Sequence, residues 1–155
     1  MPKITPKSFR KLTFFKVPAA YWTGVRLTKV DDQSAEALVK YKWINTNPFK
    51  SMYFAVQSMA AELSTGALLA KKTMEGKESF AMLIINHKGS FHKKAVGKIT
   101  FTCNDAKAID DAVAKAIETN EPQVIVTTSK GVDQQGDVVS EYEFQWSIKR
   151  RSKKN

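Results

Sequence analysis

With 155 residues, 43% of them hydrophobic and 26% charged, the chain has the size and composition of one globular domain that buries its own core. Its single cysteine, Cys103, excludes an intrachain disulfide and argues against a structural zinc site, and the lack of an apolar signal segment leads us to expect a cytoplasmic protein. The net charge of +10 would suit an anionic partner, but part of it lies in a basic tail, 149–155, and a solvated surface is the simpler interpretation.

The first part of the chain predicts a helix and then a β-hairpin. A short amphipathic helix over 6–15 opens with a capping hydroxyl and a proline, which are typical of a helix start. The hairpin strands are expected at 24–30 and 35–43. In the second strand apolar and polar residues alternate, which places Trp43 on the buried face.

The stretch over 51–72 predicts a long central helix with one acid in its middle. It is apolar on nearly every side, which is typical of a buried helix, and Ser51 is its expected N-cap. A membrane span is disfavoured by its polar residues, Gln57, Ser58, Glu62, Ser64 and Thr65. Glu62 stands inside this stretch, with Ser58 and Thr65 on the same face at helical spacing. A buried carboxylate costs free energy unless it is neutralised or compensated. Glu62 is therefore the first candidate for a functional residue, and a structural carboxylate bonded to a neighbouring backbone group or lysine is the alternative.

The second half predicts antiparallel strands with a small helix inserted between them. The strands are expected at 79–92, 98–103, 123–130 and 137–148, and the helix at 105–119. Both faces of the first of these strands are apolar at its start, which indicates a central position in the sheet. The sequence therefore predicts an α+β fold in which residues 1–148 form one domain, with an antiparallel sheet curled around the central helix.

The order of elements and the segment from Asn47 to Glu62 resemble the hotdog fold of acyl-CoA thioesterases. In the 4-hydroxybenzoyl-CoA and phenylacetyl-CoA type, this segment reads approximately Asn-x-x-Gly-x-x-His-Gly-Gly, with an acid further along the helix. The family asparagine and acid fall on Asn47 and Glu62, the histidine on Tyr53, and the two glycines on Phe54 and Ala55. The segment is also similar to a subgroup of thioesterase-like hotdog proteins, catalogued as a domain of unknown function, that has a small helix between its later strands.

The resemblance implies hydrolysis of an acyl thioester by a homodimer or a dimer of dimers, with CoA present only as part of the substrate and without a metal. Glu62 would be the base that accepts a proton from water, or the nucleophile. Asn47 would orient the water or the carbonyl group, and an Asx turn before Pro48 is its alternative role. Lys93 and Lys94 would bind the phosphates of CoA. The oxyanion hole and pocket would be lined by Tyr53, Phe54, Ala55, Ser58 and Thr65.

Two other functions remain open from the sequence. Bulky residues at the His-Gly-Gly positions favour a hotdog protein that binds acyl chains or acyl thioesters without turnover, because they remove the close backbone approach that glycine allows. The positive charge favours nucleic-acid binding, but no reader motif is present, and the aromatic residues fall on core-facing strand positions. We expect Cys103 to be an inert packing residue, and His87 and His92 to have no shared site because they face opposite sides of one strand.

Overall fold

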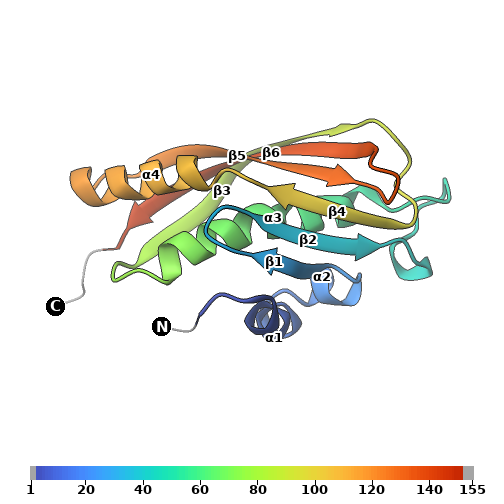
Figure 1. The fold of residues 1–155 in the computed structure, drawn as a ribbon, viewed down its shortest axis with the longest axis horizontal. Helices are drawn as coiled ribbons and strands as arrows, with labels where there is room; N and C mark the ends of the chain where they lie inside the picture. The colour runs from blue at the N-terminus through green and yellow to red at the C-terminus, as the bar shows by residue number, and fades with distance from the viewer. Residues whose placement is uncertain (1–2, 152–155) are drawn as a thin grey trace.

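The computed structural model of the chain describes residues 3–151, so the last four residues of the basic tail 149–155 lie outside the described part (Figure 1). The first half contains α1 (Pro6–Lys16), α2 (Pro18–Trp22), β1 (Arg26–Val30), β2 (Ala35–Lys40), a 3-10 turn η1 (Trp43–Asn45) and α3 (Phe54–Met74). The second half contains β3 (Phe80–Phe91), β4 (Lys98–Cys103), α4 (Ala106–Thr119), β5 (Gln123–Val132) and β6 (Val138–Arg150).

Within these residues, six strands form one antiparallel sheet in the order β1-β2-β4-β5-β6-β3. Figure 1 shows the sheet curled over α3, which runs along its inner face. The expected hairpin of the first two strands is present. The predicted α+β architecture, a curled antiparallel sheet around a central helix, is therefore confirmed.

The central helix begins three residues later than the sequence predicts. Its N-cap is Tyr53 and not Ser51, and the Tyr53 side chain makes no capping bond. Ser51 instead bonds to Asn47 in the preceding loop, which fixes that loop and delays the helix. Helix α3 then runs for 21 residues and passes through Gly66 without ending.

Helices α1 and α2 lie at the margin of the sheet below β1 (Figure 1). The start of α1 is a capping box, in which Thr5 and Ser8 each bond to the other's backbone N–H. Helix α1 packs on the core through Phe9 and Thr13. Helix α2 was not expected, because Pro18 reads as the end of a helix but here opens the next one.

Two strand predictions are wrong. Strand β3 lies at the edge of the sheet and not at its centre. Leu83 and Ile85 on its outer face are also exposed, at 64% and 49%. Strand β2 ends at Lys40, so Trp43 lies in η1 and is 88% exposed rather than buried. In both cases the apolar pattern continues onto surface that the single chain leaves uncovered.

Strands β4 and β5 are joined more weakly than the other neighbours. They pair at three positions, from Thr100 with Val132 to Thr102 with Lys130, whereas β2 and β4 pair at six. Beyond these pairs Asp105, before α4, accepts hydrogen bonds from the backbone N–H and hydroxyl of Thr128 on β5. A side chain therefore replaces the backbone ladder where the two strands separate.

Candidate functional site

The Glu62 carboxyl lies beside an apolar cavity of about 280 Å³ between α3, the N-terminal helices and the inner face of β3 and β6. The side of the cavity away from the sheet is lined by residues of α1, α2 and the link between them, which the sequence does not connect to Glu62. Apart from Glu62, the lining consists of Phe9, Leu12, Val17, Ala20, Met59, Leu63, Gly66, Ala67, Met82 and Trp146. The lining therefore suits a hydrophobic ligand, and it contains no cation that could form an ion pair with Glu62.

No hydrogen bond or ion pair to the Glu62 carboxylate is formed by residues 3–151. Burial alone raises the pKa of this carboxyl from its ordinary value of 4.5 to about 7. A structural carboxylate would instead be bonded to a backbone N–H or a lysine. The environment favours an acid that changes its charge near neutral pH.

A second pocket, of about 450 Å³, lies at the N-terminal end of α3. It brings together five residues that the sequence singled out, which are Asn47, Tyr53, Phe54, Lys93 and Lys94. Along its wall the Tyr53 ring contacts the Phe54 ring, and the Phe54 ring contacts the Phe91 ring, both edge to face. Glu62 does not line this pocket, because it lies eight residues after Phe54 along α3, which is about 12 Å at the rise of an α-helix.

The Asn47 amide is used within its own loop. Its Oδ1 atom accepts hydrogen bonds from the backbone N–H groups of Phe49 at 2.9 Å and Ser51 at 3.2 Å, and its Nδ2 atom donates to the Ser51 hydroxyl. This is the Asx turn that was the alternative expectation. The turn directs the chain into α3 and thereby shapes the second pocket.

The first turn of α3 presents free backbone donors. The N–H groups of Phe54 and Ala55 have no hydrogen-bond partner among the described residues, whereas those of Val56 and Gln57 bond to the Tyr53 carbonyl. Helix N-termini carry a partial positive charge, so two free donors here can hold an anionic oxygen.

Ser58 and Thr65 do not share the cavity with Glu62. The Ser58 hydroxyl donates to the Phe54 carbonyl at 3.1 Å, and the Thr65 hydroxyl donates to the carbonyl of Glu62 at 3.0 Å. Both groups satisfy the backbone of their own helix, which is common for Ser and Thr inside helices. Helical spacing correctly predicts that these residues lie within one turn of Glu62, but their side chains do not line the cavity.

The two neighbouring lysines have different surroundings. Lys93 forms ion pairs of 2.6 Å with both Asp133 and Asp137, and these carboxylates raise the pKa of its ammonium group. Lys94 forms no ion pair within residues 3–151 and donates to the Phe49 carbonyl at 3.3 Å. Of the two, Lys94 is the one with charge available to a phosphate.

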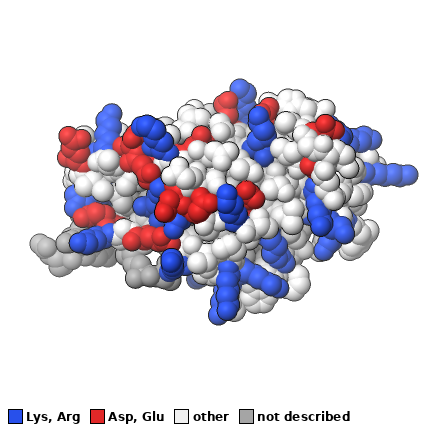
Figure 2. All heavy atoms as spheres, in the orientation of Figure 1, with Lys and Arg blue, Asp and Glu red and all other residues white. Residues whose placement is uncertain are grey.

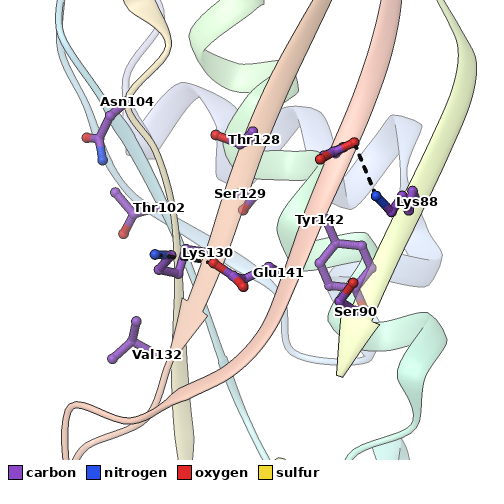
Figure 3. Close-up of a pocket in the computed structure, with 11 residues that line it drawn as sticks. Lys88, Ser90, Thr102, Asn104, Thr128, Ser129, Lys130, Val132, Glu141 and Tyr142 are labelled. Atoms are coloured by element: carbon purple, nitrogen blue, oxygen red, sulfur yellow. Dashed lines mark ion pairs between the residues drawn. The ribbon is translucent and has the colours of Figure 1, made fainter. Parts of the chain in front are cut away.

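A larger hollow, of about 670 Å³, lies elsewhere, and its lining includes Lys88 and Ser90 on β3 and Thr128 and Lys130 on β5, with β6 between them (Figure 3). Its cations already have partners, since Lys130 lies 3.2 Å from Glu141 and Lys88 lies 3.9 Å from Glu143. Charges that neutralise each other in this way offer no particular ligand an advantage, so size alone does not make this hollow the functional site.

Three further findings narrow the chemistry. Within residues 3–151 no three metal-ligating side chains come close enough to hold an ion. In the same part of the chain, every helix is too short or too polar to span a bilayer. Cys103 is buried, and its burial raises the pKa of the thiol to about 12, which makes it an unreactive packing residue.

Comparison with known proteins identifies the architecture. A Pseudomonas aeruginosa protein of unknown function, described as a probable thioesterase, matches with a TM-score of 0.80 over 96% of this chain and 99% of that chain, at 20% identity. A thioesterase from Haemophilus influenzae matches with a TM-score of 0.71 at 11% identity, over 96% and 93% of the two chains. The chain has the hotdog fold.

A third hotdog match is the PaaI protein from the phenylacetic acid degradation operon of E. coli, with a TM-score of 0.67, 12% identity and 97% of each chain covered. No family model and no curated protein matches the sequence. The likeness to thioesterase-like hotdog proteins confirms the fold predicted from the sequence. At these identities it says nothing of individual residues.

Sequence reasoning missed Gly66 and Trp146, which line the same cavity as Glu62. A Cβ atom on Gly66 would lie 3.0 Å from the Oε1 atom of Glu62 and 3.5 Å from the Trp146 ring. Gly66 gave no signal of its role, because it lies inside the helix predicted over 51–72; in the fold it makes space one turn after the acid. Trp146 gave none, because strand alternation predicts its face but not its neighbour.

Proposed function

We propose that this hotdog protein is an acyl thioesterase in which Glu62 activates water. The observation that supports this most directly is a carboxyl group with a pKa of about 7, without a partner in the described chain, beside an apolar cavity. A general base works best when its pKa is close to the working pH. The apolar lining suits an acyl chain whose reacting carbonyl stops at the acid.

In this mechanism the Glu62 carboxylate takes a proton from water while the water oxygen bonds to the thioester carbonyl carbon. The carbon–sulfur bond then breaks, the proton passes to the departing thiolate, and a carboxylic acid and a thiol are released. The negative charge that develops on the carbonyl oxygen would be held by the free N–H groups of Phe54 and Ala55. In the alternative route, Glu62 attacks the carbonyl carbon itself and water hydrolyses the resulting anhydride.

Both routes need the α3 N-terminus of one protomer to face Glu62 of another, since about 12 Å of helix separates these groups within one chain. We therefore expect a homodimer. The edge of β3 that faces away from β6 is a pairing surface 12 residues long. Sedimentation should give twice the chain mass, and a stable monomer that hydrolyses thioesters would contradict this arrangement.

The carrier of the acyl group is expected to be CoA, with Lys94 near its phosphates. Lys94 lines the pocket at the helix start and has no anionic partner in the described chain, which supports this position. Lys93 is expected to contribute little, because Asp133 and Asp137 already neutralise it.

The decisive experiment is thiol release from short, long and aromatic acyl-CoAs by the wild type, Glu62→Gln and Glu118→Gln. Glu118 is exposed on α4 and serves as the matched control. We expect the Glu62 variant to lose about 100-fold or more of the turnover, and the wild-type rate to rise with pH through about 7.

A protein that binds acyl chains without turnover is the second candidate. It is favoured by the Phe54 ring, which is 54% exposed and occupies a position where thioesterases of this type have glycine. If neither the wild type nor the variants release thiol, while native mass spectrometry shows a bound acyl compound, the binding function replaces the catalytic one.

A further inference from the structure

The outward face of α1 and α2 carries cations and large apolar side chains side by side. Phe15 is 74% exposed and Trp22 is 63% exposed. Both rings contact the ring of Phe14, so the three form one cluster outside the core. We call this region the α1–α2 surface, and it consists of Lys7, Arg10, Lys11, Phe14, Phe15 and Trp22.

The segments that carry this surface are rich in cations, and the carboxylate at the start of α1, Glu75, is held by the Ile4 N–H and Lys71. Residues 1–30 contain seven Lys and Arg and no Asp or Glu, and residues 37–61 contain three Lys and no acid. Figure 2 shows only Lys and Arg among the charged side chains along the lower margin of the molecule, to the right of the grey residues, where α1 lies in Figure 1.

The cations of this surface are also unpaired. Within residues 3–151 neither Lys7, Arg10 nor Lys11 has a carboxylate within 4.0 Å, whereas Lys72 and Lys107 on other helices each have one at 2.9 Å or less. Unpaired cations beside exposed rings are available for a partner that is both anionic and apolar.

The surface adjoins the Glu62 cavity. Leu12 on α1 and Val17, between α1 and α2, line that cavity, yet they are 37% and 39% exposed. The α1–α2 surface therefore surrounds one side of the cavity mouth.

We propose that the α1–α2 surface docks the protein on an anionic lipid bilayer. Phe15 and Trp22 insert at the level of the headgroups, and Lys7, Arg10 and Lys11 contact lipid phosphates. Docking in this orientation turns the mouth of the Glu62 cavity toward the layer in which long acyl chains dissolve. The docking itself does not depend on whether Glu62 is catalytic.

Two other partners fit less well. Nucleic acid needs flat ring faces for base stacking, but Phe14 and Phe15 meet edge to face, and the exposed Leu12 and Val17 beside them cannot stack. A second copy of the chain docked through the same surface would bring unpaired cations against each other.

The test is sedimentation of the full chain with vesicles of phosphatidylcholine alone and with vesicles that also contain phosphatidylglycerol. We expect binding to the anionic vesicles at low salt, with a blue shift of tryptophan fluorescence. Each cation removed by the pair Arg10→Gln and Lys11→Gln should weaken binding about fivefold. The pair Phe15→Ser and Trp22→Ser should also weaken it.

Matched controls lie outside the surface. Lys107→Gln with Lys130→Gln removes the same charge, Val124→Ser with Val126→Ser removes exposed apolar groups from β5, and Glu62→Gln removes the proposed base. All three should bind vesicles as the wild type does. A Glu62→Gln protein that is inactive but still docks would separate this inference from the proposed function.

Four results would overturn the proposal. The first is no binding to anionic vesicles at low salt, and the second is equal weakening by the charge controls or by deletion of residues 152–155. The third is binding of an oligonucleotide, but not of vesicles, that the surface variants abolish. The fourth is a smaller sedimenting species for Phe15→Ser with Trp22→Ser, since that would show that a second copy covers the surface.

Discussion

The Oε1 atom of Glu62 lies 3.0 Å from the point that a Cβ atom would occupy on Gly66, and two atoms of the Trp146 ring lie 3.5 and 3.6 Å from that point. Glycine inside a helix costs about 0.5–1 kcal/mol relative to alanine. The glycine here leaves the Glu62 carboxyl the space that a Cβ atom would crowd. A helix that gives up stability next to its one central acid is consistent with selection for a site at that acid.

Gly66→Ala should therefore separate stability from activity. The methyl group gains helix propensity but displaces the Glu62 carboxyl, which is the end of a flexible side chain, so unfolding free energy should change by no more than about 1 kcal/mol. Thiol release should fall and its pH dependence should shift. Gly76→Ala is the control, because nothing lies within 4 Å of its added Cβ atom. Full activity in Gly66→Ala would argue against a role for the carboxyl position.

Glu62→Gln should make the protein more stable at alkaline pH. Burial raises the pKa of Glu62 from 4.5 to about 7 in the folded state only. The folded protein therefore loses stability as pH rises through this interval, by up to about 3 kcal/mol in total, and glutamine avoids this loss. Urea unfolding should give nearly equal stabilities at about pH 4 and a more stable variant at about pH 8. Equal stabilities at both values would mean that Glu62 is ionised in the fold at little cost.

Phe54→Pro should abolish one oxyanion donor without breaking α3. Position 54 is the first residue of the helix, where proline is tolerated. Tyr53 before it has a φ of −59° and a ψ of 133°, which is the extended conformation that a following proline requires. Turnover should fall by about 100-fold, as for other lost oxyanion donors. Phe54→Ala, which keeps the N–H and loses the ring, should retain far more activity. Similar losses in both variants would assign the effect to the ring.

The same variant tests the dimer. If the helix start of one protomer serves Glu62 of the other, then mixing inactive Phe54→Pro with inactive Glu62→Gln under conditions of subunit exchange should restore part of the activity. Each mixed dimer would contain one intact site. No recovery in demonstrably mixed dimers would place both groups in the same chain's site.

Lys94→Glu should raise the KM for acyl-CoA, because it replaces the available cation beside the N-terminal pocket with an anion. Lys93→Glu should raise it less, because Lys93 is held by Asp133 and Asp137. The KM for a short N-acetylcysteamine thioester, which lacks the nucleotide, should not change in the Lys94 variant. Equal effects on both substrates would exclude a phosphate contact.

Gly131→Ala should destabilise the fold strongly. Gly131 pairs with Phe101 across β4 and β5, and a Cβ atom there would lie 2.5 Å from the fully buried Phe101 ring. Relief requires a shift of that ring in a close-packed core, which costs about 1–3 kcal/mol. Thermal unfolding beside Gly76→Ala measures this cost. An unchanged melting temperature would show that the ring has room to move.

The sequence predicted the parts of this molecule that one period or one local rule controls. Alternation located β2 of the hairpin, and an almost unbroken apolar stretch located α3 with the partly buried Glu62 inside it. The resemblance then predicted the hotdog arrangement of these elements. Each of these inferences uses residues that are close in sequence.

What the sequence did not reveal depends on residues that meet only in the folded chain. The contact of α1 with the Glu62 cavity joins residues more than 40 positions apart. The two aspartates that neutralise Lys93 come from the turn between β5 and β6. The edge position of β3 was also missed, because an apolar strand face reads the same whether a chain's own core or the surroundings lie against it.

The short pairing of β4 with β5 divides the sheet into two ladders, β1-β2-β4 and β5-β6-β3, joined at three positions around Phe101 and Gly131. Cooperative units of a protein tend to separate where few hydrogen bonds cross between them. Amide protons along this seam should therefore exchange with solvent sooner than those between β5 and β6. The two ladders would then open relative to each other along this line, while α3 stays packed against strands of both.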